Sequence, residues 1–214
     1  MDAEQALLIG AHLLCSQDQW LWDPYDGHRL IFYPDGTGEM ISRGELVVLL
    51  VAGTEWKLLP LAGREGETST SSVRPHSVPS AAPSLFPTPA TSTLFRGILE
   101  LTVTRRRPLL YGRHANYISI ETLLFETAFQ TRRIDVSIDR GEFHLSWNFD
   151  RPESSDRYRL RLTLSESPYP PVETWRPAER STVELVKFSQ MTQFCARLSL
   201  RAGGESESSR CLVM

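Results

Sequence analysis

The chain has 214 residues, of which 41% are hydrophobic and 23% are charged, and its formal net charge is -3 at pH 7. This composition is typical of a soluble globular protein with one substantial core. A negative net charge argues against nucleic acid as a partner, because phosphate binding requires a basic face. We expect one domain over residues 1–200, interrupted by an insertion at 63–93 and followed by a flexible tail at 201–214.

The N-terminal residues differ from a signal peptide, because Asp2 and Glu4 stand where a basic region is required. No apolar run reaches the roughly 18 residues of a membrane-spanning helix. We therefore expect a cytoplasmic protein.

A short helix is expected at residues 3–14, AEQALLIGAHLL, because small and apolar residues recur there at helical spacing. The positions that share this face are Ala3, Ala6, Leu7, Gly10, Leu13 and Leu14.

The stretch LIFYPDGTGEM at 30–40 could be a phosphate loop, a calcium loop or a turn. It lacks the lysine of a Walker loop, the third glycine of a dinucleotide fingerprint and the regularly spaced acids of a calcium loop. Pro34, Asp35 and Gly36 are typical of a tight turn, and the flanking residues continue as strands. The stretch therefore predicts a hairpin, with Ile31 and Phe32 on opposite faces of its first strand.

Most later segments alternate apolar and polar residues, which is typical of antiparallel strands with one buried face. The run at 45–59 is apolar on both faces where it begins, and is expected to be a central strand. A turn at Gly141 is expected to join two of the alternating strands into a hairpin. The alternating strands are expected at 96–104, 133–138, 143–149 and 157–164.

Two further segments are less regular. Residues 182–200 fit a helical stripe through Leu185, Phe188 and Met191, and also fit a closing strand; we expect two strands there. Residues 63–93 are dominated by Ser, Thr and Pro, and such composition cannot offset the entropy of ordering a chain. We therefore expect a disordered insertion.

Several stretches carry a resemblance to known proteins: WDPYDGHRLIFYPDGTGEM, ELVVLLVAGTEWK, ELTVTRRRP, RIDVSIDRGEFHLSWNF and RYRLRLTLSESPYPP. In this combination the chain resembles a family of uncharacterised filamentous-fungal proteins. More distantly, it is similar to the calycin or lipocalin-like barrels, whose early strands share a W…F..DG.G pattern. The resemblance covers most of the chain outside the insertion and the tail. It implies a mainly β fold, an antiparallel barrel with a short N-terminal helix.

A barrel of about eight strands is either filled by its own side chains or holds one small apolar ligand, and the sequence leaves both open. The apolar strand faces, which include Leu101 and Val136, would line its interior. The first hypothesis is a protein that binds a small apolar molecule. The resemblance also implies a second hypothesis, that the protein is a cofactor-free isomerase or cyclase of fungal secondary metabolism. A third hypothesis is a non-catalytic interaction scaffold. The candidate ligand-binding residues are Phe32, Trp56, Phe143, Trp147 and Tyr158.

The sequence carries no motif that assigns a reaction. G-x-S-x-G, H-E-x-x-H and C-x-x-C do not occur, and the histidines are scattered. We therefore expect no metal and no cofactor, and assign no catalytic residue. Cys15 and Cys195 lie among apolar residues and are expected to be buried.

The last four residues, Cys211 to Met214, have the C-a-a-X pattern of a prenylation site, with a final residue of the farnesyl type. The cysteine thiolate is the nucleophile towards the prenyl diphosphate, so a prenyltransferase is an expected partner. One lipid chain binds bilayers weakly, with a constant of roughly 10⁴ M⁻¹, and no polybasic segment precedes Cys211. We expect weak, reversible association with internal membranes.

Replacing Cys211 by Ser is expected to abolish this association, because serine cannot take the prenyl group. Intact-protein mass and the membrane fraction of the tagged chain in eukaryotic cells measure the effect. An Arg210→Ala control keeps the motif and should keep the lipid. Equal membrane fractions for the wild type and Cys211→Ser, with no lipid mass on Cys211, would refute prenylation.

Overall fold

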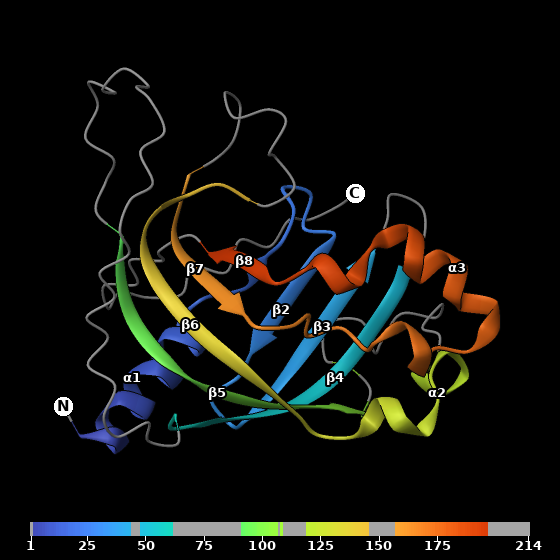
Figure 1. Cartoon of the computed structure of the whole chain (residues 1–214), viewed down its shortest axis with the longest axis horizontal. Coiled ribbons are helices and arrows are strands. Elements are labelled where there is room, and N and C mark those ends of the chain that lie inside the picture. Colours follow the sequence, from blue (N-terminus) through green and yellow to red (C-terminus); the bar gives the residue numbers. More distant parts are fainter. Residues whose placement is uncertain are drawn as a thin grey trace, which may run out of the picture.

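The computed structural model describes residues 2–43, 48–61, 91–106, 108, 119–145 and 157–196. Within these residues, the chain forms a mainly β domain whose eight strands follow one another around a closed antiparallel barrel (Figure 1). The strands are β1 (Trp20–Leu21), β2 (His28–Phe32), β3 (Thr37–Arg43), β4 (Val48–Leu59), β5 (Ser92–Thr104), β6 (Arg132–Phe143), β7 (Tyr158–Leu164) and β8 (Gln193–Ala196).

The helices lie before the first strand and in two connections between later strands. They are α1 (Ala3–Cys15), α2 (Ile120–Leu123), the 3₁₀ helix η1 (Glu126–Phe129), η4 (Val172–Thr174), α3 (Pro177–Val186) and η5 (Phe188–Gln190). No helix in the described part of the chain is long and apolar enough to cross a membrane.

The barrel closes where the first strand pairs with the last. Leu21 of β1 lies opposite Cys195 of β8, and every other pair of neighbouring strands is also antiparallel. Leu21 and Cys195 belong to a small buried cluster with Phe143, Leu145 and Tyr158, which is separate from the main core. The seam between β1 and β8 is therefore covered by apolar side chains.

The main core lies on the inner face of the barrel. The register places Leu30 opposite Met40, Met40 opposite Ala52, and Leu162 opposite Phe194, so the inward residues of neighbouring strands meet. Burying each large apolar side chain stabilises the fold by about 1.5–3 kcal/mol. The inner-face members of this core are Trp20, Leu30, Phe32, Met40, Leu50, Ala52, Leu58, Phe95, Leu99, Leu101, Val103, Ile134, Val136, Ile138, Leu160, Leu162, Leu164, Phe194 and Ala196.

Helix α1, predicted from the sequence, packs against the end of the barrel where β4 ends and β5 begins (Figure 1). Leu14 of this helix is fully buried in the main core. The Trp20 indole nitrogen donates a hydrogen bond of 3.1 Å to the carbonyl oxygen of Leu14, which fastens the helix to the first strand. Gly10 lies against Phe95, and a Cβ atom at Gly10 would come within 2.6 Å of the Phe95 ring.

The opposite end of the barrel is covered by the connections that contain α2, η1, η4, α3 and η5 (Figure 1). Trp175 and Phe188, from two parts of the β7–β8 connection, are buried in the main core there. An isolated bridge between Leu124 and Trp175 ties the two connections together.

The hairpin predicted at 30–40 is confirmed. Gly36 has a φ of 82°, a value that glycine adopts without steric cost, and its amide donates to the Tyr33 carbonyl oxygen. The Asp35 carboxylate accepts hydrogen bonds from the amide and hydroxyl of Thr37, and both bonds lower the Asp35 pKa. Asp35 is thus a turn residue.

The predicted turn at Gly141 is wrong. Strand β6 runs through Gly141, and the irregular register between Arg140 and Phe143 indicates a bulge. Glycine is typical of bulges within strands as well as of turns between them. The presence of a glycine at position 141 therefore could not distinguish a bulge from a turn. The bulge moves Phe143 out of the predicted inward alternation.

The prediction of two strands at 182–200 is also wrong. Pro177 occupies the first turn of α3, and Lys187 ends this helix in the left-handed conformation. Of the two strands, β8 is present, and residues 197–200 lie outside the described part of the chain.

The predicted insertion at 63–93 extends too far, because Ser92 and Thr93 belong to β5. Thr93 donates a hydrogen bond to Asp139 of β6, a tertiary contact that composition does not reveal. Residues 62–90 and the predicted tail at 201–214 lie outside the described residues.

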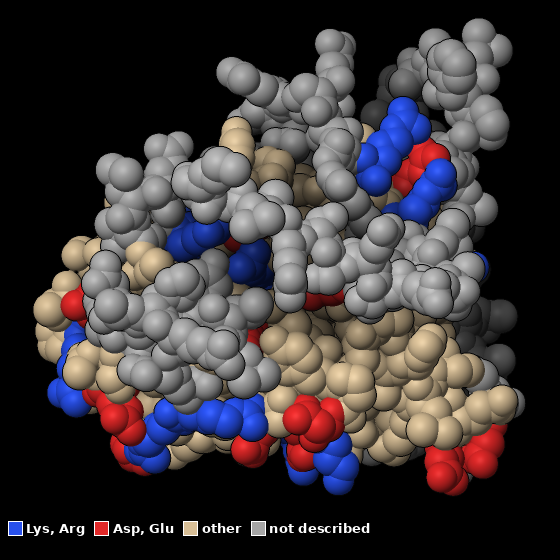
Figure 2. All heavy atoms as spheres, turned by 180° about the vertical axis from the view of Figure 1, so that it is seen from behind, with Lys and Arg blue, Asp and Glu red and all other residues tan. Residues whose placement is uncertain are grey.

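Acidic and basic side chains stand next to one another on the outer surface (Figure 2). Arg133 pairs with Glu100 at 2.9 Å, and Arg157 and Arg159 both pair with Glu142. These exposed pairs each contribute little, typically about 0.2–1 kcal/mol.

Substituting Gly10 by Ala is expected to destabilise the protein by about 1–3 kcal/mol, because the added methyl group overpacks the contact with Phe95. Chemical unfolding of both proteins measures the loss. In a Phe95→Leu background the smaller side chain should relieve the contact, so the same change should cost less. An equal or larger cost in that background would contradict this packing of α1.

Candidate functional site

The predicted ligand residues that the structure describes lie in two places. Phe32 and Trp56 pack edge to face at the main core, with ring centroids 5.5 Å apart, and the Trp56 indole donates to the Thr37 carbonyl oxygen. Phe143 and Tyr158 are buried in the separate cluster at the seam. The remaining predicted residues, Trp147 and Cys211, lie outside the described part of the chain.

A pocket of about 570 Å³ instead lies at the end of the barrel opposite α1. Its walls come from the start of β6, the connection after β7, and the segment from α3 to the start of β8. The volume is within the usual range of about 300–1,000 Å³ for small-molecule sites.

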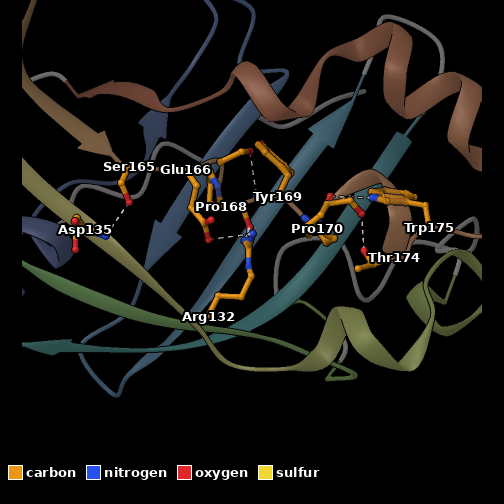
Figure 3. A network of polar contacts seen from close by, with 11 residues as sticks. Arg132, Asp135, Ser165, Glu166, Pro168, Tyr169, Pro170, Thr174 and Trp175 are labelled. Atoms are coloured by element: carbon orange, nitrogen blue, oxygen red, sulfur yellow. Dashed lines mark hydrogen bonds and ion pairs between the residues drawn. The ribbon is translucent and has the colours of Figure 1, made fainter.

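The floor of the pocket is aromatic. The Tyr169 and Phe188 rings stack with centroids 4.7 Å apart and an interplanar angle of 13°, and Phe188 also stacks on Trp175. Tyr169 donates a hydrogen bond to the Ile41 carbonyl oxygen. The Trp175 indole donates to the Pro170 carbonyl oxygen (Figure 3). These bonds hold the floor rigid. Burial raises the Tyr169 pKa well above its ordinary value, so this hydroxyl stays protonated.

One wall carries a partly buried arginine. The Arg132 guanidinium donates to the Pro168 carbonyl oxygen and pairs with Glu166 at 3.6 Å (Figure 3). The Arg132 side chain is 21% exposed, whereas that of Glu166 is 53% exposed. Burial lowers the Arg132 pKa, and the negative charge of Glu166 opposes this shift.

Two serine hydroxyls lie on the same wall. The Ser165 oxygen accepts a hydrogen bond of 3.0 Å from the Asp135 amide, and the Ser167 oxygen accepts one of 3.3 Å from the Tyr169 amide. Because these oxygens act as acceptors, each hydroxyl keeps its hydrogen as a donor.

The rim of the pocket is charged and exposed. Glu173, Glu184 and Lys187 line it. Lys187 has a φ of 57°, a backbone conformation that residues other than glycine rarely adopt. This residue turns the chain from α3 into η5 and so places Phe188 beneath the pocket.

Under the floor, Asp23, His28 and Ser42 form an arrangement that resembles a catalytic triad. The Ser42 hydroxyl lies 2.9 Å from His28 Nδ1. However, the Asp23 carboxylate accepts hydrogen bonds from the amides of Tyr25, Gly27 and His28, and Ser42 is fully buried. A nucleophile must reach its substrate, so we assign these residues a structural role.

The His28 ring lies edge to face with the rings of Trp22, Tyr169 and Phe188. Burial among these rings lowers the His28 pKa below its ordinary value of 6.5, and the negative charge of Asp23 opposes the shift. The neutral imidazole is thus favoured in the folded protein.

Of the two described cysteines, Cys195 is buried as predicted, whereas Cys15 is only partly buried and packs against the main core. Burial raises the Cys15 pKa to about 11 and the Cys195 pKa to about 12. Both thiols therefore remain protonated at neutral pH, unlike a reactive thiolate. Among the described residues, no group of three or more His, Cys, Asp or Glu side chains could hold a metal ion.

Comparison of the chain with protein-family models, curated protein sequences and solved structures gave no match. The site must therefore be judged on its own geometry. Sequence reasoning missed the pocket residues Arg132, Ser165, Ser167, Tyr169 and Phe188. One local signal was present: SESPYPP places an aromatic residue between prolines directly after a strand, which favours a stiff, ordered connection.

The lowered His28 pKa predicts that the fold loses stability in acid. The unfolded chain binds a proton at His28 more tightly than the folded protein does. The stability that comes from neutral His28 is therefore complete above about pH 6.5 and declines as the pH falls towards the folded-state pKa. Between about pH 8 and about pH 5, the free energy of unfolding should fall less in His28→Gln than in the wild type. Exposed His12→Gln is the control and should decline as the wild type does. Equal declines in all three proteins would contradict a buried, neutral His28.

Proposed function

We propose that this protein binds a small molecule in the pocket at the end of the barrel opposite α1. The pocket itself carries the proposal: it has the volume of a ligand site, a rigid floor of stacked Tyr169 and Phe188, and a few polar groups along one wall. Binding sites commonly combine an apolar surface with a small number of placed polar groups.

The position of this proposed site differs from the first hypothesis, which placed an apolar ligand inside the barrel. In the described residues, the inward side chains Leu99, Ile134 and Leu160 are fully buried and pack in one core. Side chains commonly fill a barrel of this strand number. We therefore locate the ligand at the barrel end.

We also propose a distant kinship with the calycin barrels. This proposal is supported by the fold alone: in the described part of the chain, eight antiparallel strands form a closed barrel in which neighbours follow the order of the sequence. The isomerase or cyclase alternative and the prenylation of Cys211 stay predictions.

A substitution that fills the pocket tests the proposal. Ser189 lies exposed on the pocket lining, so Ser189→Trp should occupy the space without disturbing the core. The probe is naphthalenemethanol, a neutral molecule with a flat apolar body, and a dissociation constant of about 1 mM or tighter is expected for a ligand of this size. Saturation-transfer NMR and calorimetry measure its binding.

Ser189→Trp should weaken probe binding by about tenfold or more, because the indole competes for the same space. Leu185→Trp is the matched control, since Leu185 is 81% exposed on the same side of the connection, in α3, and does not line the pocket. If the wild type does not bind the probe, or if both variants bind it as the wild type does, the pocket is not the site.

A further inference from the structure

We infer that the ligand of this pocket is an anionic amphiphile, a flat apolar molecule with a carboxylate that binds to Arg132, Ser165 and Ser167. This inference rests on the proposed function and adds the chemical class of the ligand. It follows from how charge, hydrogen-bond donors and apolar surface are distributed around the pocket.

The charge that lies deepest is positive. Arg132 is 21% exposed, whereas Glu166 is 53% exposed and Glu173, Glu184 and Lys187 all lie exposed at the rim. Charges at the rim are screened by water, but a partly buried charge interacts more strongly with a ligand. The electrostatic preference of the pocket is therefore set mainly by Arg132.

The internal partners of Arg132 do not fully satisfy it. The Pro168 carbonyl oxygen takes one donor, and Glu166 approaches another nitrogen only to 3.6 Å. Charge-assisted hydrogen bonds are normally about 2.7–2.9 Å long, so the pair with Glu166 is loose. A guanidinium has five N–H donors and binds a carboxylate with two parallel bonds. A ligand carboxylate can thus take the remaining donors or displace the exposed Glu166.

The neighbouring hydroxyls add donors to the same wall. The Ser165 and Ser167 oxygens each accept a backbone hydrogen bond, which leaves the hydroxyl hydrogens to donate. Figure 3 shows Ser165 next to Asp135, with Glu166 between it and the Arg132 guanidinium. Hydroxyl donors on the wall that also carries a cation favour an acceptor-rich anion over an amine or an alcohol.

The floor selects the other half of the ligand. The stacked rings of Tyr169 and Phe188 lie behind this side of the pocket and are only 1% and 3% exposed. The Tyr169 hydroxyl is already bonded to the Ile41 carbonyl oxygen. The apolar surface that a ligand can reach comes from the exposed Val172 and the half-buried Pro171, which also line the pocket.

A series of probes with one apolar body and three head groups tests the inference: naphthoate, naphthalenemethanol and naphthylmethylamine. Calorimetry on the wild type at neutral pH should show naphthoate binding at least about tenfold more tightly than the alcohol, with the amine weakest. If the alcohol binds in the pocket and naphthoate binds no better, or if the amine binds best, the inference is wrong while the proposed function stands. If no probe binds, both are wrong.

Two substitutions locate the preference. Arg132→Gln should remove the tenfold preference for naphthoate over naphthalenemethanol, because the glutamine carries no positive charge. Because Arg132 also bonds to Pro168, its loss could unfold the connection; exposed Ser165→Ala provides a milder variant. Ser165→Ala should lower the ratio of naphthoate affinity to naphthalenemethanol affinity several-fold. The control Ser92→Ala, in β5 opposite the far end of β6, should change neither. An unchanged ratio of acid to alcohol affinity in both Arg132→Gln and Ser165→Ala would overturn the inference.

Discussion

The pairing of β1 with β8 closes the sheet, and the rest of the architecture depends on that closure. Closing a sheet removes its exposed edges but creates two open ends, where the inward apolar side chains would meet water. In this chain α1 covers one end, fastened by Trp20 and Leu14, and the β7–β8 connection covers the other with Tyr169, Trp175 and Phe188. The two covers are built differently, and this difference separates their roles.

The helical cover is apolar and tight. Gly10 has no room for a side chain against Phe95, so α1 functions as a plug. The other cover combines rings that face the core with polar groups that face outward. Tyr169 and Phe188 belong to the main core and also form the floor of the pocket. The residues that seal the barrel therefore also support the proposed binding site from behind, and Arg132 at the start of β6 supplies a charge to its wall.

Much of the fold could be predicted from sequence, because regular strands and amphipathic helices leave periodic patterns. Helix α1 and the hairpin around Gly36 are confirmed, and so are the strands predicted at 96–104, 133–138 and 157–164. The separate strand predicted at 143–149 is not, because Phe143 is the last residue of β6, residues 144 and 145 belong to no strand, and 146–149 lie outside the described residues. Gly141 was misjudged because glycine serves both turns and bulges. The proposed pocket lies away from the predicted ligand residues for a different reason. The described aromatic residues among them pack in two clusters, whereas the pocket combines one strand residue, Arg132, with residues from an irregular connection. Such convergence comes from tertiary structure and has no local period.

The most direct test of this account is amide hydrogen–deuterium exchange of the wild-type protein with and without naphthoate. The account predicts slower exchange in residues 165–192 and at the start of β6, because the ligand contacts both walls of the pocket. The amides of strands β2 to β5 should exchange at the same rates with and without the ligand. Slower exchange confined to β2–β5, or no change anywhere at saturating naphthoate, would contradict a ligand site at this end of the barrel.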